Sequence, residues 1–559
     1  MLTWIAGLVC LSAPAQPAHV TVVLERVPGP AVGIRIVLPG DEDGHTSVSL
    51  ADGWGGIEGA GREIGAVGAR DQRGTALDVT PEADHRWSVL HAPGEMIEVA
   101  YELTPHDREE LPAGHNDYRP LVRDGLFHAI GNHALLLPED GDAEVLCALR
   151  WQGFEGWTLA SSLGPGAAPA HALLSIDDLR SCFFIGGEPP RVRLAKRDLP
   201  GGAVGLAVID ADWGFTDDRL MDLVMDVVRV ERDFFADHTD PWFLVALTPN
   251  GGRASGQSFS LGGTGLTDCF ALYCNTGLDL APGGAHTEHV LRLLAHEYFH
   301  TWNGRKLRID APEGAAYWFS EGFTDFYARR LLRQAGLFAD EGYLGSLNRS
   351  LADFDGNPLR HAPNERIVAD FWNDAHVGAL PYRRGDLLAL AIDEAIAAKS
   401  GGAESLDDLM RELHARAASG APPLTPEQLF DRFAEETSPE AAAAIRACVI
   451  HGAEPPVPET IEGGSLVLTT GRMREGADGF DVTASLESGV VCGVVEGSGA
   501  FDAGLRDGQR VSSVERLPPV AGPSRLKVRL VQDDSALRTL VFEAVSPPRT
   551  VRRYVPAGG

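Results

Sequence analysis

The sequence has few cysteines, few basic residues for its length and no long hydrophobic run. Its 559 residues include 48 Lys and Arg against 79 Asp and Glu, so the formal net charge is −31. A surface this negative repels phosphate backbones, which disfavours nucleic acid as a partner. No apolar run beyond the N-terminus reaches the roughly 20 residues of a membrane-spanning helix, which excludes a polytopic membrane protein.

The 7 cysteines are sparse and irregularly spaced. Cys10 lies in the N-terminal apolar stretch, and the other cysteines follow neither a disulfide framework nor a zinc-knuckle spacing. Cys269 and Cys274 are close enough in sequence to pair in an oxidising compartment. The alternative is that they are two separate buried thiols.

The N-terminus resembles an export signal. A short apolar stretch, LTWIAGLVCLSA, is followed by Ala13-Pro14-Ala15, a small-residue cleavage pattern. We therefore expect residues 1–18 to be a signal peptide and the mature protein to be periplasmic or secreted, without a stable membrane span. No Lys or Arg precedes the apolar stretch, which is atypical. The alternatives are a buried first strand or a misplaced start codon.

The chain divides into several regions by composition and hydrophobic pattern. Residues 19–185 contain short β-branched runs separated by Gly, Pro and Asp clusters, which predicts an antiparallel β-sandwich. Residues 186–452 predict strands at 203–209 and 242–247, a helix from about Thr216 to Ala236, and further helices at 287–303, 318–335, 385–398, 405–418 and 426–435. A proline-rich linker at 453–461 precedes a small β-rich domain at 462–550.

The strongest chemical signal is His296-Glu297-Tyr298-Phe299-His300, set in an apolar helical pattern. Residues i and i+4 share one face of a helix, so both imidazoles can reach one metal ion. Glu297 is placed to take a proton from a metal-activated water without binding the metal. This short pattern also arises by chance, in which case the histidines would be surface or satisfied core residues.

A catalytic zinc needs a third protein ligand and one open position. Glu321 lies in a second helical segment, after a gap that contains Gly304 and Pro312 and suits a turn between antiparallel helices. We therefore expect Glu321 to face both histidines. Asp325 follows one turn later and is a candidate to accept the second N–H of a ligating imidazole. The alternative for each acid is a solvated position on the helix surface.

The segments HEYFHTWN at 296–303 and WFSEGFT at 318–324 resemble the glycyl aminopeptidase family of gluzincin metallopeptidases. The segment WQGFEGWTLA at 151–160 resembles another that recurs in that family. The resemblance implies a multidomain α+β protein with an N-terminal β-domain, a thermolysin-like, mainly helical catalytic domain and a C-terminal PDZ domain. It implies that His296, His300 and Glu321 bind one Zn²⁺ per chain and that Glu297 is the base.

Two further segments bear on the reaction that this resemblance implies. Tyr382 lies three residues before Gly385, where related aminopeptidases place a tyrosine that stabilises the oxyanion; the alternative is an aromatic residue packed in the core. The family's segment with a glutamate that binds the substrate amine corresponds to residues 251–259 here. This stretch contains Gln257 and no glutamate. The resemblance makes a small-residue aminopeptidase the first hypothesis. The missing glutamate makes an endopeptidase the second.

The segment at 488–511 resembles a bacterial-type PDZ domain, with GSGA at 497–500, AGL at 503–505 and DGQ at 507–509. The resemblance implies that a peptide carboxylate binds near Ser488 and Gly489 and that the peptide adds as a strand. The alternative is a PDZ fold that binds no peptide. If the PDZ domain does bind peptide, a third functional hypothesis is a PDZ-bearing peptide-binding protein with a vestigial metal site. His286, His289 and His376 lie outside the ligand spacing, and we expect them not to bind the metal.

Overall fold

The structure is a computed structural model that describes residues 17–105, 118–254, 259–474, 476–517, 524–532 and 536–558. The chain divides into two compact units, Met1–Tyr298 and Phe299–Gly559. The expected signal peptide lies outside the described residues except for its last two positions. Within the described ranges, no helix combines the length and the apolar character that crossing a bilayer requires.

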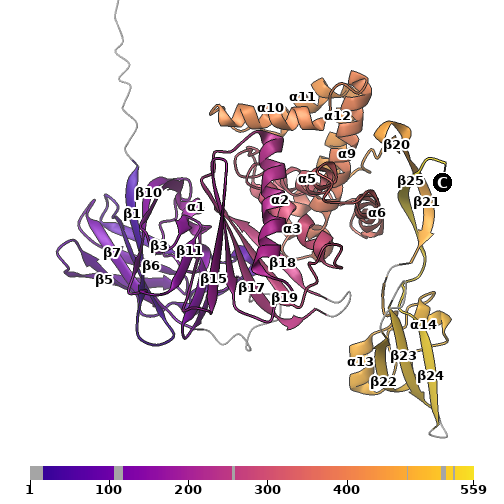
Figure 1. Cartoon of the computed structure of the whole chain (residues 1–559), viewed down its shortest axis with the longest axis horizontal. Coiled ribbons are helices and arrows are strands. Elements are labelled where there is room, and N and C mark those ends of the chain that lie inside the picture. Colours follow the sequence, from indigo (N-terminus) through magenta and orange to yellow (C-terminus); the bar gives the residue numbers. More distant parts are fainter. Residues whose placement is uncertain are drawn as a thin grey trace, which may run out of the picture. The chain divides into compact units, whose positions relative to one another are not determined.

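The first unit begins with a nine-stranded sheet (Figure 1). Its strands lie in the order β13 (Ala170–Ser175), β10 (Glu144–Gln152), β1 (Ala18–Arg26), β2 (Val32–Pro39), β7 (Met96–Leu103), β4 (Gly68–Asp71), β5 (Ala76–Ala83), β6 (Arg86–Leu90) and β3 (His45–Ser49). Buried and more exposed residues alternate along β7, as expected for a sheet with one face against a core.

A second sheet of five strands completes the N-terminal β-domain. Its order is β12 (Gly164–Pro165), β11 (Thr158–Ser161), β14 (Phe183–Gly187), β9 (Leu126–Ile130) and β8 (Leu121–Arg123). Ile34 and Val99 of the first sheet share one buried cluster with Phe127 and Phe184 of the second. The predicted N-terminal β-domain is therefore confirmed.

One strand pair in that domain departs from the antiparallel expectation. Strands β1 and β10 run parallel, with Ala18 opposite Val145. Parallel neighbours need a crossover rather than a hairpin, and the long chain between these two strands provides one.

A mixed sheet follows in the same unit, in the order β15 (Val192–Leu199), β16 (Gly202–Ile209), β17 (Trp242–Arg253), β19 (Cys269–Thr276) and β18 (Leu261–Leu266). Strands β16, β17 and β19 run parallel and are mostly buried, whereas β18 is an antiparallel edge strand. Helix α2 (Asp217–Phe235) connects β16 to β17, and its Thr216 side chain caps the first turn by accepting from the Arg219 amide. The strands and the helix predicted here are confirmed.

Cys269 and Cys274 both lie on β19 and do not form a disulfide. Five residues of extended chain separate their Cα atoms by about 16 Å, and side chains an odd number of positions apart face opposite sides of a strand. A disulfide cannot span that distance, so the pairing hypothesis is wrong and the buried-thiol alternative is correct. Burial raises the pKa of Cys274 to about 12.

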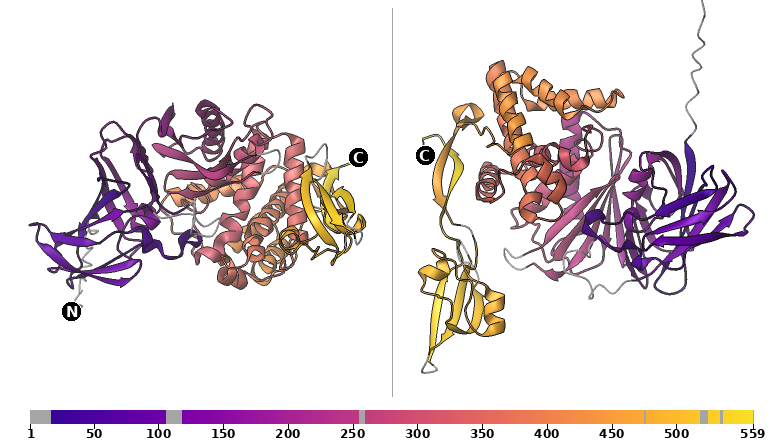
Figure 2. Two further views of the ribbon diagram at one scale, coloured as in Figure 1. Left: turned by 90° about the horizontal axis from the view of Figure 1, so that it is seen from below. Right: turned by 180° about the vertical axis from the view of Figure 1, so that it is seen from behind.

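The second unit is mainly helical in its first part, as the salmon to orange ribbons of Figure 2 show. Its helices are α4 (Glu313–Ser320), α5 (Gly322–Gln334), α6 (Asp340–Gly356), α7 (Asn364–Asp370), α8 (Ala375–Gly378), α9 (Leu380–Ser400), α10 (Leu406–Ala418), α11 (Pro426–Glu436) and α12 (Pro439–His451). The helices expected at 385–398, 405–418 and 426–435 are confirmed. The helix expected at 318–335 is divided between α4 and α5, while α6, α7, α8 and α12 were not predicted.

Helices α5, α6 and α9 share a buried ion pair. The guanidinium of Arg329 on α5 donates to both carboxylate oxygens of Asp386 on α9, at 2.9 and 2.6 Å. The Ser350 hydroxyl on α6 donates to the same carboxylate at 2.6 Å. Both charged side chains are almost fully buried, at 2% and 1% exposure, so the pair fixes how the three helices pack.

The C-terminal part of this unit contains two small sheets. Strands β20 (Thr460–Ile461), β21 (Leu466–Met473) and β25 (Arg549–Pro556) form one of them. This sheet packs on α6: the Asn348 side chain exchanges two hydrogen bonds with the Tyr554 backbone, and Arg552 pairs with Asp355 at 2.6 Å.

The second small sheet contains β22 (Arg510–Leu517), β23 (Arg525–Val531) and β24 (Leu537–Glu543). With α13 (Val482–Ser488) and α14 (Gly499–Asp502), it surrounds a core that includes Leu526 and Val528 (yellow in Figure 1). The segment is small and rich in strands, as expected. Its identification as a PDZ domain stays a prediction.

The buried ion pair leads to a stability prediction. Arg329→Met should lower the free energy of unfolding by about 3–5 kcal/mol, because the Asp386 carboxylate then stays buried without its counter-charge. Urea denaturation, followed by circular dichroism of the helices, measures this loss. The matched control is Arg446→Met, which removes an exposed pair with Glu427 and should cost far less stability than Arg329→Met. Equal losses in the two variants would contradict the assignment.

Candidate metal centre

Helix α3 (Thr287–Phe299) carries the first predicted metal ligand. The apolar residues that predicted this helix, among them Val290, Leu294 and Ala295, are buried. Tyr298 fixes the last turn: its hydroxyl accepts from Arg232 of α2 at 2.9 Å, and its ring meets Phe243 of β17 edge-on at 4.6 Å. The turn that presents His296 therefore has a rigid support.

The three predicted ligands come together. One donor atom from each of His296, His300 and Glu321 lies within 4.8 Å of the others. His300 Nε2 and Glu321 Oε2 are 3.5 Å apart. Tetrahedral zinc with bonds of about 2.0–2.1 Å places its ligand atoms about 3.3 Å from one another, so this donor set fits zinc. Within the described parts of the chain, no other group of His, Cys, Asp and Glu side chains has donor atoms this close together.

Asn303 holds the second histidine in place, a role that sequence reasoning missed. The Asn303 carbonyl oxygen lies 3.0 Å from His300 Nδ1, which leaves Nε2 facing Glu321. The fully buried Asn303 side-chain amide donates to the carbonyls of Phe319 and Ser320, at 3.0 and 3.2 Å. One residue thus orients a ligand and ties its turn to the end of α4.

Glu321 lies between α4 and α5 rather than inside one regular helix. Its amide donates to the Tyr317 carbonyl at 2.8 Å, and its own carbonyl accepts from the Asp325 amide at 2.9 Å. The two helices therefore continue through this residue. Phe319 and Phe323 pack their rings 4.6 Å apart on either side and anchor the junction.

Glu297 is half-buried and lies beside the edge strand β18. A β-carbon added to Gly265 would come within 3.1 Å of Glu297 Oε2. Gly265 was not singled out from the sequence, although the run Gly262-Gly263-Thr264-Gly265 was a visible signal. Strand β18, Leu-Gly-Gly-Thr-Gly-Leu, carries no carboxylate.

The stretch at 251–259, where the family's amine-binding glutamate was expected, is only partly described. Gly251, Gly252 and Arg253 end β17, and Gln257 lies outside the described residues. No role for Gln257 is assigned.

Tyr382 lies in the first turn of α9, which begins five residues before its predicted start. A β-carbon on Gly385 would overlap the Trp318 carbonyl oxygen and lie 2.7 Å from the Cα atom of Gly322. The absence of a side chain therefore lets α9 approach the segment that carries Glu321. This contact holds the first part of α9, which contains Tyr382, against Trp318 and Gly322 on either side of Glu321.

Asp325 is buried, and its Oδ2 accepts a hydrogen bond from Arg383 Nη1 at 3.1 Å. For His300, the atom available for orientation, Nδ1, lies against the Asn303 carbonyl instead. A role for Asp325 in orienting His296 stays a prediction.

Glu231 on α2 is a third residue that the sequence did not reveal. It is 1% exposed, and among the described residues neither of its carboxylate oxygens has a hydrogen-bond partner. Burial raises the pKa of Glu231, while the nearby His296 acts in the opposite direction. Its side chain thus lies buried near His296, where a charge is disfavoured.

The three histidines expected to be non-ligands do not join the cluster. His286 accepts from the Asp279 amide at 2.9 Å, and Phe259 packs edge-on against His286 and His289. His376 belongs to the short helix α8.

Ser488 and Gly489, the predicted peptide-binding positions, form the end of α13. The Ser488 hydroxyl donates to the Ala484 carbonyl at 2.7 Å, and Gly489 caps the helix in a left-handed conformation with φ of 69°. The Val490 amide points to the Ser488 hydroxyl at 3.4 Å. These positions are occupied in closing a helix, and peptide binding there stays a prediction.

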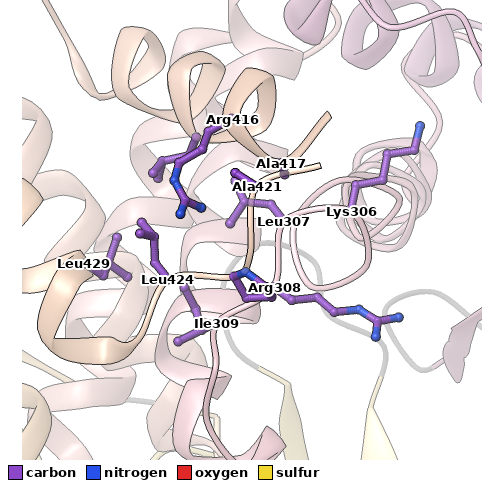
Figure 3. A pocket seen from close by; sticks show the side chains of 11 residues that line it. Lys306, Leu307, Arg308, Ile309, Arg416, Ala417, Ala421, Leu424 and Leu429 are labelled. Carbon is purple, nitrogen blue, oxygen red and sulfur yellow. The ribbon is translucent and has the colours of Figure 1, made fainter. Parts of the chain in front are cut away.

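A separate hollow of about 410 Å³, partly open to solvent, lies between residues 306–309 and side chains of 413–429 (Figure 3). It is lined by apolar side chains such as Leu307, Leu424 and Leu429 and by Lys306, Arg308 and Arg416. None of the predicted site residues lines it, so it is distinct from the metal centre.

Comparison with known sequences singles out the same region. Residues 289–376 match the family model described as M61 glycyl aminopeptidase. That stretch contains the three clustered ligands together with Glu297 and Asp325, and it ends before Tyr382. No curated protein sequence matches the chain significantly.

Solved structures extend the likeness to nearly the whole chain. An aminopeptidase N family protein from Idiomarina loihiensis is similar over 96% of this chain and 98% of its own, with a TM-score of 0.69 and 15% identity. An M1 zinc metallopeptidase from Deinococcus radiodurans is 18% identical over 80% of this chain and 96% of its own, with a TM-score of 0.48. The chain therefore has the fold of the Idiomarina protein, and its residues 289–376 are similar to M61 glycyl aminopeptidases.

Proposed function

We propose that this protein is a zinc-dependent peptidase that hydrolyses peptide bonds. The observation that carries the proposal is the cluster formed by His296, His300 and Glu321. Glu297 directly follows His296 on the last turn of α3. Two imidazoles and one carboxylate leave a position open, as catalytic zinc sites do and structural ones do not. The match to M61 glycyl aminopeptidases over 289–376 supports the same reaction.

His296, His300 and Glu321 would hold one zinc ion per chain. When bound, zinc supplies Lewis acidity and lowers the pKa of a water ligand to about 7. The chain's own residues would do the rest. The Asn303 carbonyl would fix the His300 ring, and the helix junction would fix Glu321.

Glu297 is the proposed general base and acid. It follows the first ligand directly, and β18 restricts its surroundings through the contact at Gly265. Its carboxylate would take a proton from the attacking water and then pass that proton to the leaving amine. Tyr382 would donate its hydroxyl hydrogen bond to the carbonyl oxygen of the substrate as negative charge develops there.

An aminopeptidase and an endopeptidase differ in whether they require a free N-terminus on the substrate. The family match favours an aminopeptidase, and the resemblance implies a preference for small N-terminal residues. One observation favours the second candidate, an endopeptidase: the wall beside Glu297, Leu261–Leu266, offers no carboxylate to a substrate ammonium group. Export of the protein, with cleavage of residues 1–18, is part of the same proposal.

Replacing the base should separate catalysis from metal binding. Glu297→Gln should retain zinc and lower kcat by about 10²–10⁴-fold, because the amide cannot accept the proton. Zinc content and peptide turnover measure the two effects. Glu288→Gln, an exposed acid on the same helix, is the control and should keep wild-type turnover. Near-wild-type activity of the Glu297 variant would refute the mechanism.

A variant of Tyr382 tests whether its hydroxyl stabilises the oxyanion. Tyr382→Phe should lower kcat by about 10²-fold with KM nearly unchanged, because the lost hydrogen bond forms in the transition state. Steady-state kinetics on one peptide measures both constants. A rise in KM at constant kcat would instead assign Tyr382 to ground-state binding.

Peptide substrates with free or blocked N-termini distinguish the candidate functions. We expect chelation to abolish hydrolysis of free peptides and zinc to restore it, with one zinc per chain by metal analysis. Equal cleavage of blocked peptides would support the endopeptidase. Stoichiometric zinc without hydrolysis of either set would favour a binding protein with a vestigial site. If wild-type protein binds no zinc, the proposed function is wrong.

A further inference from the structure

Two charged layers join helices α5, α6 and α9 at equivalent positions. The inner layer is the buried set of Arg329, Asp386 and Ser350. The outer layer reverses the charges: Arg383 on α9 donates to Asp325 on α5 at 3.1 Å and pairs with Asp353 on α6 at 3.1 Å. Its members lie four residues earlier on α5, three earlier on α9 and three later on α6.

The outer layer is more exposed than the inner one. Asp353 is 37% exposed and Arg383 is 26% exposed, so the contact between these two contributes little to stability, whereas Asp325 is only 11% exposed. The inner pair is buried and already links α5 to α9. The position of the outer layer is what distinguishes it.

That position is next to the metal centre. Asp325 lies one turn beyond Glu321 on α5, and its amide donates to the Glu321 carbonyl at 2.9 Å. Arg383 directly follows Tyr382 on α9. One guanidinium therefore connects the element of the third metal ligand to the element of the oxyanion donor.

We propose that Arg383 is a positioning residue, which fixes the Asp325 carboxylate and keeps the Glu321 segment in register with Tyr382. The inference rests on the proposed peptidase function. Arginine suits this role because its planar fork can donate to two carboxylates at once, whereas lysine presents a single point charge. Asp353 anchors the far side of the guanidinium, so that it cannot rotate away from Asp325.

The test compares Arg383→Met, Arg383→Lys and Asp353→Asn in the full chain. Groups around metal ligands typically contribute 10–100-fold to metal affinity or activity. We expect Arg383→Met to weaken zinc binding by about tenfold in a chelator competition and to lower kcat by about tenfold with KM within about twofold. Arg383→Lys should fall between this variant and the wild type, and Asp353→Asn should lose about threefold in both readouts.

Arg446→Met is the control for losing an arginine–carboxylate pair elsewhere in the same unit, and it should leave zinc affinity and kcat unchanged. Thermal unfolding of the zinc-free proteins checks stability. Arg383→Met leaves the buried Asp325 carboxylate unpaired and should lower the midpoint modestly, whereas Asp353→Asn keeps that pair and should stay near the control.

Wild-type zinc affinity and kcat in Arg383→Met would overturn the proposal. So would a loss that follows a large drop in the unfolding midpoint, since that result means a structural role. If the wild type binds zinc but cleaves no peptide, the proposed function fails, and the zinc affinities alone still decide the role of Arg383.

Discussion

The side chain of Asn303 makes the interaction on which the candidate site depends. A turn of helix can present two histidines to one metal, but the third ligand comes from a different element and must be held at the right distance. The Asn303 side-chain amide donates to backbone carbonyls at the end of α4, while the backbone carbonyl oxygen of Asn303 lies against His300 Nδ1. Because the amide is fully buried, no water competes for these hydrogen bonds.

Close backbone approach is the second requirement. Gly322 and Gly385 lie where α5 and α9 meet, and a β-carbon on either would overlap the other helix or its neighbour. Gly265 plays a comparable part on β18, where a side chain would crowd the Glu297 carboxylate. The absence of a side chain at Gly265 leaves room beside the proposed base, and its absence at Gly322 and Gly385 lets α5 and α9 approach each other.

Sequence reasoning succeeded where the signal was local. The i, i+4 spacing of His296 and His300 and the acid in the following helical segment were sufficient to predict a cluster that the structure contains. The cores of the N-terminal β-domain, α2 and most of the later helices followed from periodicity. Helix α6 was missed because it contains Gly345 and Gly356 and several polar residues, and its packing against β25 and α9 compensates for that weak pattern. The disulfide hypothesis failed because sequence proximity says nothing about the face of a strand.

The amino-acid sequence by itself determined the chemistry that this protein can carry: the ligand types, the base beside them, the acidic surface and the absence of a long apolar span among its described helices. These properties reside in residue identity and short spacing. Only the tertiary structure decided that Asn303 orients His300, that Gly265 lies against Glu297 and that Arg383 joins two carboxylates on different helices. Each of these contacts involves a backbone direction or a partner from another element, and such relations arise only when the chain has folded.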